Sequence, residues 1–455
     1  MARPTSLRLL SRICLELVIW DSKTTDKWFG SEVFASIFFE VKRVVTLTAF
    51  LFVQSLFSTP ENWPRFRGNN GEGGASFEIP AVWEKADYRW ILPLQENGHG
   101  SPAVWGERVF LNSSSKKGQI RKVLCVGTKS GEIEWSHSYA SQNHKTHRFN
   151  SFASSTPALD SYNVYSVWGH ESELIVTAHT HLGTLLWERD LGGVKGGHGF
   201  AVSPIVFEGV LIVPNDQEKG GGAHYGLDCK TGKTRWQIPR ASKRLTYSTP
   251  CIFTSPKGKS EIIFTNWWLG FTSLEPHTGK QLWELSVFGR PHSERAISSP
   301  IVAGDLVLGV CGFTTLNKHL VAIRPASVSQ NGKAEEVWRL EETMPHIPSP
   351  LLSGNRLYLW ADSGVITCVR PQTGEQVWKA RVKGVRDTFF GSPVRAGNKI
   401  FCVSAHGDVV SIADSDQFKQ LGITEIGQVC RSTPALANGD LYLRTAEDLI
   451  CIKGE

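Results

Sequence analysis

Eight side chains with ligand-binding chemistry stand within a few residues before a Ser-Pro or Thr-Pro dipeptide. They include two imidazoles, two guanidinium groups and three aromatic rings: His99, Ser154, Phe200, Tyr247, Arg295, His346, Phe390 and Arg431. Guanidinium groups form charge-assisted hydrogen bonds to carboxylates and phosphates. If the positions converge, we expect a site for an anionic or polar ligand. We assign ligand binding to His99, Tyr247, Arg295, His346, Phe390 and Arg431. The alternative is that these side chains fill a narrowing channel and hydrogen-bond to neighbouring loops.

Two close histidine pairs, His144/His147 and His179/His181, are candidates for metal binding. A His-x-His pair on a strand places both rings on one face. No adjacent Cys or carboxylate completes a known ligand spacing, so we predict solvated or loop-bonded histidines and no metal site. The paired indoles of Trp267 and Trp268 would suit stacking on a sugar or a peptide if exposed. We favour the alternative in which one of them faces the core.

The dipeptides recur through the chain and predict its architecture. They are Ser101-Pro102, Thr156-Pro157, Ser203-Pro204, Thr249-Pro250, Ser299-Pro300, Ser349-Pro350, Ser392-Pro393 and Thr433-Pro434. Successive prolines are separated by 55, 47, 46, 50, 50, 43 and 41 residues, and each is followed by a strand-like run. A period of roughly 40–50 residues with several strands per unit is typical of a β-propeller blade.

Most units end in a Thr-Gly turn and a strand that contains tryptophan. The tryptophans at this position are Trp135, Trp187, Trp236, Trp283, Trp338 and Trp378. A large ring at one repeat position favours a structural role, in which it bridges neighbouring blades. Residues 414–419 lack this tryptophan. We therefore predict one degenerate contact between blades.

The two ends of the repeat predict how the ring closes. The last unit stops after its third strand, at residues 448–452, and the first Ser-Pro is preceded by an isolated fourth-strand phrase at 86–92. Pairing the two would complete an eighth blade and remove the free sheet edges. We predict an all-β, eight-bladed β-propeller with four-stranded blades, closed by N- and C-terminal strands that share the last blade.

The N-terminal residues resemble an export signal. Lys42 and Arg43 precede an apolar run at 44–57, which is the layout of a signal peptide and is short for a membrane span. We divide the chain into a misassigned extension (1–40), a signal peptide-like segment (41–58) and one propeller domain (59–455). This predicts a periplasmic or extracellular protein without stable membrane insertion once the leader is removed. The alternative is a weak amphipathic anchor formed by residues 1–40 with 44–57.

The charge and the cysteine positions argue against a nucleic-acid-binding protein and against a disulfide framework. The formal net charge is +6, without a Lys/Arg cluster, which disfavours nucleic-acid binding. Four of the nine cysteines, Cys125, Cys229, Cys368 and Cys451, occupy the same position in different units. Equivalent positions on different blades lie too far apart for a disulfide. We therefore interpret them as small buried apolar side chains.

The motif at residues 63–71 (Trp-Pro-Arg-Phe-Arg-Gly-Asn-Asn-Gly), the Ser/Thr-Pro openings and the Thr-Gly-x-x-x-Trp endings resemble the PQQ-like β-propeller repeat proteins. The secreted versions of planctomycete-type bacteria are the most similar, and the resemblance covers about residues 62–455. The resemblance implies one fold, but it is compatible with two kinds of function. Quinoprotein alcohol and glucose dehydrogenases bind pyrroloquinoline quinone (PQQ) with Ca²⁺, whereas the outer-membrane assembly lipoprotein uses a similar ring as a scaffold without chemistry.

Most of the residues and motifs that a quinoprotein dehydrogenase requires are absent from this sequence. The family's alcohol dehydrogenases carry a vicinal Cys-Cys disulfide, and this chain has no Cys-Cys. They also need a carboxylate base and oxygen ligands for Ca²⁺, for which Asp216 and Asp387 are the candidates. We therefore expect a non-catalytic scaffold without a resident cofactor, which binds a protein segment or a small polar or carbohydrate ligand. The alternative is an alcohol or sugar dehydrogenase-like oxidoreductase that uses PQQ with calcium.

Overall fold

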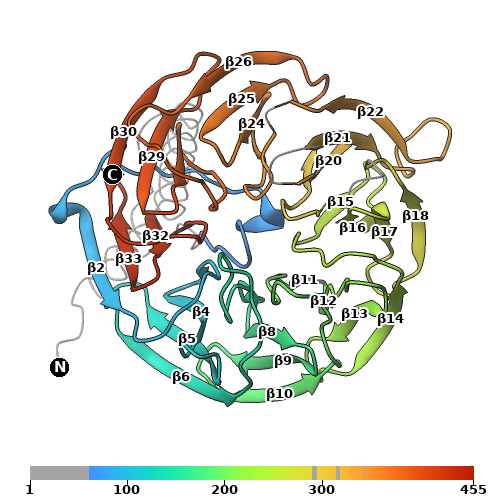
Figure 1. Ribbon diagram of the computed structural model, residues 1–455, viewed down its shortest axis with the longest axis horizontal. Helices are drawn as coiled ribbons and strands as arrows, with labels where there is room; N and C mark the ends of the chain where they lie inside the picture. The colour runs from blue at the N-terminus through green and yellow to red at the C-terminus, as the bar shows by residue number, and fades with distance from the viewer. Residues whose placement is uncertain (1–60, 289–294, 314–317, 343) are drawn as a thin grey trace, which may run out of the picture. The chain divides into compact units, whose positions relative to one another are not determined.

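The computed structural model describes residues 61–455 apart from 289–294, 314–317 and 343. The predicted extension and signal peptide-like segment therefore lie outside the described residues. Pro60–Glu455 forms one compact unit, in which eight antiparallel sheets surround a central channel (Figure 1). The described part of the chain contains no α-helix and no helix that is long and apolar enough to cross a membrane. The predicted all-β, eight-bladed propeller is confirmed.

The first four blades follow one another along the chain, and each runs in strand order from the channel outward. Their strands are β3 (Ala103–Trp105), β4 (Arg108–Ser114), β5 (Ile120–Gly127), β6 (Ile133–Ala140); β7 (Ala158–Leu159), β8 (Asn163–His170), β9 (Glu173–Thr180), β10 (Leu185–Asp190); β11 (Ile205–Phe207), β12 (Val210–Val213), β13 (Gly222–Asp228), β14 (Thr234–Arg240); and β15 (Cys251–Thr254), β16 (Ser260–Asn266), β17 (Gly270–Leu274), β18 (Gln281–Leu285).

The other four blades repeat the arrangement, with two additions from the N-terminal part of the chain. Their strands are β19 (Ile301–Ala303), β20 (Leu306–Cys311), β21 (His319–Arg324), β22 (Glu335–Leu340); β23 (Leu351–Ser353), β24 (Arg356–Trp360), β25 (Val365–Val369), β26 (Gln376–Arg381); β27 (Val394–Ala396), β28 (Lys399–Val403), β29 (Asp408–Ala413), β30 (Gln420–Glu425), with β1 (Gly74–Ala75) parallel to β27; and β31 (Ala435–Ala437), β32 (Asp440–Arg444), β33 (Asp448–Lys453) and β2 (Tyr88–Pro93).

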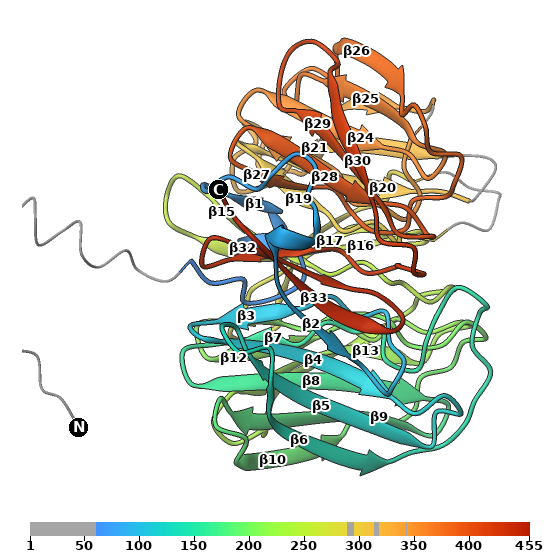
Figure 2. The same ribbon diagram turned by 90° about the vertical axis from the view of Figure 1, so that its left-hand side faces the viewer.

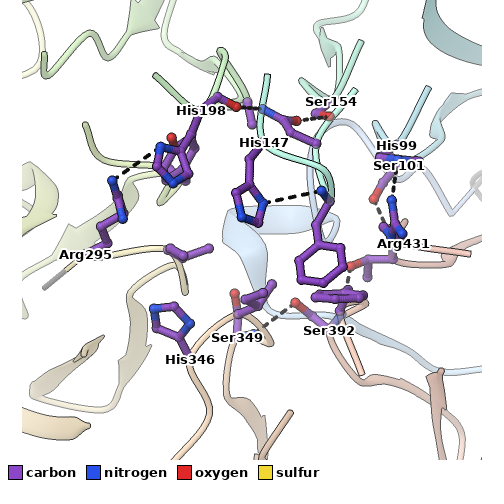
Figure 3. A pocket seen from close by; sticks show the side chains of 18 of the residues that line it. His99, Ser101, His147, Ser154, His198, Arg295, His346, Ser349, Ser392 and Arg431 are labelled. Carbon is purple, nitrogen blue, oxygen red and sulfur yellow. Dashed lines mark hydrogen bonds between the residues drawn. The ribbon is translucent and has the colours of Figure 1, made fainter. Parts of the chain in front are cut away.

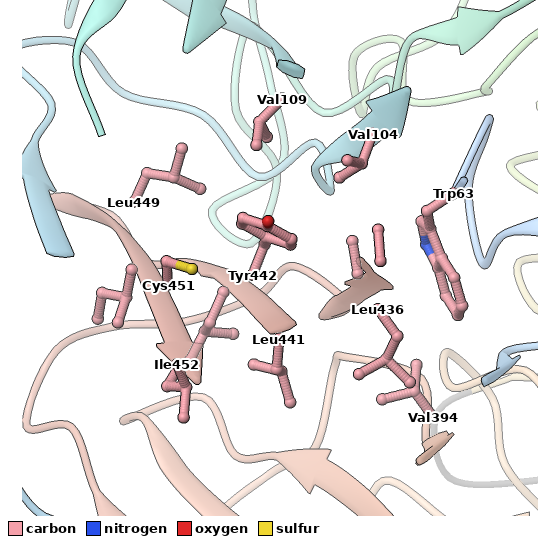
Figure 4. Packing of buried hydrophobic residues seen from close by; sticks show 14 of the residues in the cluster. Trp63, Val104, Val109, Val394, Leu436, Leu441, Tyr442, Leu449, Cys451 and Ile452 are labelled. Carbon is pink, nitrogen blue, oxygen red and sulfur yellow. The ribbon is translucent and has the colours of Figure 1, made fainter. Parts of the chain in front are cut away.

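The eighth blade closes the ring as predicted. Strand β2 pairs antiparallel with β33, and Trp90 lies opposite Cys451 (Figure 2). Around this closure, apolar side chains of the first, seventh and eighth blades form one buried cluster that includes Trp63, Val104 and Tyr442 (Figure 4). Because the last blade contains strands from both ends of the domain, its pairing holds the whole ring shut.

Five of the six repeat tryptophans dock onto the following blade through their indole N–H. Trp187, for example, donates to the Cys229 carbonyl oxygen at 3.0 Å, and Gly232 of the same turn lies on its ring. Trp283 differs because it donates to Glu261 in its own blade. The equivalent turn of the next blade, residues 325–334, is longer. The other four acceptors are the carbonyl oxygens of His181 (for Trp135), Pro276 (for Trp236), Pro371 (for Trp338) and Ser415 (for Trp378).

The blade without a repeat tryptophan is packed by another part of the chain. Gly422 stands where the other blades carry tryptophan, opposite Ser411. A Cβ at Gly422 would lie 2.0 Å from Val82 Cγ2, so glycine leaves room for the segment before β2. Next to it, Trp83 is buried, and its backbone N–H donates to Thr424 Oγ1 at 3.2 Å. This blade therefore lacks the docking bond of a repeat tryptophan, in agreement with the predicted degenerate contact, and the indole N–H of Trp83 has no partner among the described residues.

Residues 63–75, which we call the plug, pass along the inner strands of the ring and form the floor of the channel (Figure 1). Trp63 exchanges two backbone hydrogen bonds of 2.8 Å with Val104 of β3. Asn70 does the same with Ile252 of β15 through its side-chain amide, at 2.8 Å for each bond. The motif at 63–71 thus ties together blades that lie on different sides of the channel.

Among the described residues, seven bonds from a backbone N–H to a hydroxyl link the Ser or Thr of one dipeptide to that of the next blade, and only the link from Ser203 to Thr249 is missing. The N–H of Ser101 donates to the Thr156 hydroxyl at 3.0 Å, and the N–H of Thr433 donates to the Ser101 hydroxyl at 2.9 Å, which crosses the junction of the last and first blades. The remaining bonds of this kind among the described residues measure 2.9–3.0 Å. We call these side chains the hydroxyl belt: Ser101, Thr156, Ser203, Thr249, Ser299, Ser349, Ser392 and Thr433.

Candidate functional site

The channel opens on the side of the loops that enter each blade, as a cavity of about 600 Å³ (Figure 3). Loops that enter all eight blades contribute lining residues, and Phe66 of the plug lines the cavity as well. The predicted ligand-binding residues His99, Tyr247, Arg295, His346, Phe390 and Arg431 all line this cavity. The structure thus brings the six together, and their role in binding a ligand stays a prediction.

Of the other two positions expected at the rim, one lines the cavity and one does not. Ser154 lines it, whereas Phe200 is 7% exposed and packs in the core between the second and third blades. Ala201 takes the cavity position instead. The prediction for Phe200 is wrong because Ala201 stands two residues before its dipeptide, as Tyr247 and Phe390 do, and Phe200 one residue further away.

The sequence analysis missed the long loop between β6 and β7, residues 141–157. This loop places His147, Arg148, Phe149 and Asn150 in the cavity. The interval of 55 residues between the first two prolines, the longest of the series, carried the signal for this insertion. A loop longer than its counterparts in the other blades has residues to spare for reaching over the channel.

One side of the cavity is an aromatic and cationic wall. Phe149 lies against Phe390, with 4.9 Å between the ring centroids. The Arg431 guanidinium carbon lies 5.2 Å from the Phe149 centroid and 5.6 Å from the Phe390 centroid. The guanidinium of Arg148 lies 4.5 Å from the Phe149 centroid. Stacking on aromatic faces holds both cations without neutralising their charge.

The second side is built from stacked imidazoles and a paired arginine. The rings of His147 and His198 stack at 4.9 Å with an interplanar angle of 11°. Arg295 Nη2 lies 3.2 Å from Glu218 Oε1 and 3.4 Å from His198 Nδ1. Glu218 therefore balances the charge of Arg295. The flat faces of the two imidazoles are suited to contact with planar groups.

The histidines of the cavity are neutral at pH 7. Burial, with Arg431 and Arg444 as further causes, lowers the pKa of His99 to about 3. Burial is also the main cause of the lowered pKa values of His147, His198 and His346. The positive charge of the cavity therefore comes from its arginines.

The lining carries little negative charge to balance those arginines. Arg148 and Arg431 form no ion pair within the described residues. Asp362 is the carboxylate among the described lining residues, and it accepts the N–H groups of His346 at 2.9 Å and Ile347 at 3.0 Å. It also pairs with Lys318 at 3.0 Å. The cavity as a whole is positive.

Several hydrogen-bond donors of the cavity lack an acceptor. Arg295 Nε, Arg431 Nε and Tyr247 Oη are buried without a partner among the described residues. Burial raises the pKa of Tyr247, so its hydroxyl keeps the proton that it can donate. Buried donors without an acceptor are costly in folded proteins. Because all three groups are hydrogen-bond donors, they indicate a ligand that is rich in acceptor atoms.

The residues present do not fit Ca²⁺ beside a quinone. Asp216 is buried outside the cavity, where it pairs with Arg240 at 3.0 Å and accepts from Asn266 at 2.8 Å. Asp387 accepts the backbone N–H groups of Thr388 and His406, each at 2.7 Å. No cluster of three His, Cys, Asp or Glu side chains with metal-binding geometry occurs in the described part of the chain. The oxygen ligands that Ca²⁺ requires are therefore not assembled at this cavity.

The candidate histidine His179 and the paired indoles of Trp267 and Trp268 are held in packing contacts with neighbouring side chains. His179 is buried, stacks on His137 at 4.9 Å and lies 2.6 Å from the Tyr139 hydroxyl. Trp267 is 8% exposed in a core cluster, and Trp268 is half-buried beneath the Lys243 ammonium, which lies 3.5 Å from its ring centroid. The two indoles do not form an exposed stacking platform, since one of them faces the core.

The cysteines also occupy structural positions. All eight cysteines of the described residues are buried, as the interpretation of small buried side chains requires.

Eight blades that begin with Ser/Thr-Pro, most of which dock onto the next blade through a tryptophan of the outer strand, define a PQQ-like β-propeller. The family model described as outer membrane protein assembly factor BamB matches residues 81–237, 152–380 and 270–454, and the chain belongs to this family. The match covers nearly the whole of the propeller. The family therefore agrees with the fold, and the choice between scaffold and enzyme depends on the cavity.

Similar proteins include both kinds of function. The chain is 22% identical over 230 residues to the polyvinylalcohol dehydrogenase of Sphingopyxis sp. (strain 113P3), which covers 49% of this chain and 33% of that protein. The chain thus spans about a third of that relative's length. BamB from Moraxella catarrhalis matches with a TM-score of 0.55 and 14% identity, over 80% of this chain and 96% of that one. Quinohemoprotein alcohol dehydrogenase from Comamonas testosteroni matches with 0.62 and 13%, over 86% and 80%. At these identities the structures show the fold alone.

Proposed function

We propose that this protein is a non-catalytic binding scaffold whose channel receives an acidic segment of a partner protein. The observation that carries the proposal is the pair of arginines, Arg148 and Arg431, that stack on phenylalanines at the cavity without an ion pair among the described residues. Carboxylates are the protein groups that match this fork of donors. The description of the family as an assembly factor agrees with a partner that is a protein.

The cavity's chemistry also favours acidic over neutral ligands. Its neutral histidines and aromatic rings provide flat contact surfaces, while the unused donors of Arg431, Arg295 and Tyr247 require acceptors. A carbohydrate offers as many donors as acceptors, so it would satisfy them less well. A carboxylate offers acceptors alone.

Binding should be measured with the full chain and a fluorescein-labelled octaglutamate peptide, by fluorescence anisotropy, with octalysine as the charge-reversed probe. We expect octaglutamate to bind, octalysine not to bind, and the affinity to fall with added salt. Arg431→Ala removes charge-assisted bonds worth about 1.5–3 kcal/mol, which is roughly a 10- to 150-fold loss of affinity. Arg235→Ala is the matched control, because Arg235 lies on the outer strand β14 and pairs with Asp228.

Two results would contradict the proposal. One is the failure of octaglutamate to bind at low salt, and the other is an equal loss of affinity in the Arg431 and Arg235 variants. PQQ, titrated with and without Ca²⁺, tests the alternative. PQQ is a planar molecule with carboxylates, so the arginines and aromatic rings of the cavity favour it as a second candidate. Saturable binding that strengthens with Ca²⁺, followed by alcohol- or sugar-dependent reduction of an electron acceptor, would replace the scaffold with an oxidoreductase.

The proposed compartment is the periplasm or the exterior of the cell, with residues 41–58 as the removable leader and 59–455 as the mature domain. The apolar run after Lys42 and Arg43 supports this proposal. N-terminal sequencing of the native precursor and of the mature protein tests it. A precursor that begins at Met1 would contradict the assignment of residues 1–40 as a misassigned extension.

A further inference from the structure

The hydroxyl belt holds donors that no described protein group uses. A serine or threonine hydroxyl donates one hydrogen bond and accepts up to two. In the belt, every hydroxyl oxygen except that of Thr249 accepts an N–H of the preceding blade, as Ser349 does from Ser299 and Ser392 does from Ser349, both at 2.9 Å. Among the described residues, no belt hydroxyl donates its proton to a carbonyl or a side chain. Each belt hydroxyl therefore keeps a proton to donate.

Seven of the eight belt residues lie at the wall of the cavity. The belt residues are 1–5% exposed, so bulk water reaches them through the channel and not from the outer surface. All of them except Ser299 line the cavity (Figure 3 labels Ser101, Ser349 and Ser392). An acceptor for the belt must come from inside the channel.

The belt lies at the deep end of the cavity, directly above the plug. Thr249 precedes Pro250, whose carbonyl oxygen accepts from Arg65 Nη2 of the plug at 2.8 Å. Ser101 likewise stands three residues before Val104, which bonds to Trp63. Phe66 lines the same space from the plug. A ligand that enters past the arginines of the loops therefore meets the belt last.

The hydrogen-bond donors of the belt favour an anionic ligand. The belt offers O–H donors, the nearby Tyr247 hydroxyl and Arg431 Nε are also donors without acceptors, and Asp362 is already engaged by Lys318. A cation would meet the positive charge of the arginines, whereas an oxyanion presents lone pairs in several directions. The ring of donors surrounds the channel and matches a group with several equivalent oxygens.

We propose that the hydroxyl belt is an oxyanion-binding site, which takes a phosphate, sulfate or carboxylate group in the channel through hydrogen bonds from several belt hydroxyls. This inference rests on the proposed function of the same cavity, because it assigns the chemical group of the ligand that enters most deeply. The group is either a free inorganic oxyanion or the anionic end of a larger ligand.

The test is calorimetric titration of the full chain with sodium phosphate and sodium sulfate at low ionic strength, with sodium chloride as the reference. We expect phosphate or sulfate to bind with saturation. Ser349→Ala and Ser392→Ala should each weaken binding by about fivefold, the loss of one hydrogen bond. Ser299→Ala is the matched control. It removes a belt acceptor in the same way, from the Thr249 N–H at 2.9 Å, but Ser299 does not line the cavity. We expect this variant to bind as the wild type does, and Ser349→Thr to restore binding.

The outcomes separate this inference from the proposed function. An equal loss in the Ser299 and Ser349 variants would overturn the inference, since it would trace the effect to the integrity of the ring. The absence of phosphate and sulfate binding, with octaglutamate binding intact and unaffected by Ser349→Ala, would also overturn it and leave the scaffold standing. Phosphate binding that depends on Ser349, without octaglutamate binding, would support the belt and refute the acidic-segment scaffold. Displacement of phosphate by octaglutamate would identify the oxyanion as the end group of a larger ligand, and phosphate binding without displacement would identify a free oxyanion.

Discussion

Replacing Trp187 with alanine measures how much one blade contact contributes to the ring. Trp187 is 9% exposed, donates to the Cys229 carbonyl oxygen at 3.0 Å and lies against Gly232 of the next blade, where a Cβ would stand 2.7 Å from its ring. Truncation of a buried tryptophan costs about 3–5 kcal/mol, and the lost hydrogen bond adds about 1 kcal/mol. We therefore expect the free energy of unfolding to fall by about 4–6 kcal/mol in total.

Trp283→Ala is the matched comparison. Trp283 occupies the same repeat position but is half-buried, and its indole N–H donates to Glu261 in its own blade at 2.7 Å. Without a bond to the next blade, we expect a loss of about 1–3 kcal/mol. Guanidinium chloride unfolding, followed by circular dichroism, compares the two variants at equal protein concentration. A Trp283 variant that loses as much stability as the Trp187 variant would refute the reasoning that docking onto the next blade, and not burial of any indole, closes the ring.

Three further predictions concern the turns, a buried histidine and the plug. Gly232→Ala places a Cβ 2.7 Å from the Trp187 ring at a φ of +67°, so its thermal unfolding midpoint should fall further than that of Gly106→Ala, which has a φ of +54° and open space around it. Burial lowers the pKa of His224 to about 3. The stability that the neutral His224 contributes is therefore fully present above the unfolded pKa near 6.5, and it is lost as the pH falls toward 3. His224→Gln should flatten the dependence of the unfolding free energy on pH between these two values. Asn70→Gly removes two hydrogen bonds to Ile252 and should lower the free energy of unfolding by about 1–3 kcal/mol. We expect faster amide hydrogen exchange across residues 63–75. Unchanged exchange there would contradict the assignment of Asn70 as a plug anchor.

The parts of this structure that could be predicted from the sequence are those that the repeat specifies. The Ser/Thr-Pro spacing counts the blades, and the unpaired phrases at 86–92 and 448–452 predict the closure, because both depend on local strand and turn signals. The six candidate ligand residues converge for the same reason. Each stands two to four residues before a dipeptide that precedes an inner strand, and a ring brings such positions to one axis. Phe200 shows the limit of this argument, since it stands three residues before Ser203, as His346 does before Ser349, yet it lies in the core.

The parts that could not be predicted depend on contacts outside the repeat. Phe149 reaches Phe390 from a loop that has no counterpart in the other blades, so no periodicity placed it. Trp83 bonds to Thr424 of the blade that lacks a repeat tryptophan, although the two residues lie more than 300 residues apart along the chain. Side chains that meet only in three dimensions leave no local pattern. For both residues the sequence offered weak signals, a long interval between prolines and a tryptophan outside the repeat.

The arrangement of the dipeptides explains how one ring can carry unrelated functions. The proline directly precedes the inner strand, where its missing N–H is least costly. The hydroxyl before it joins neighbouring blades, as the Ser101 hydroxyl of the first blade does by accepting the Thr433 N–H of the last. The residues a few positions earlier, such as Arg431 and His99, line the cavity and take no part in the bonds between dipeptides. Because the fold depends on the dipeptide and the ligand on the residues before it, the lining can change while the ring stays intact. The cavity's arginines, and not the propeller itself, are therefore the features that argue for an anionic ligand in this protein.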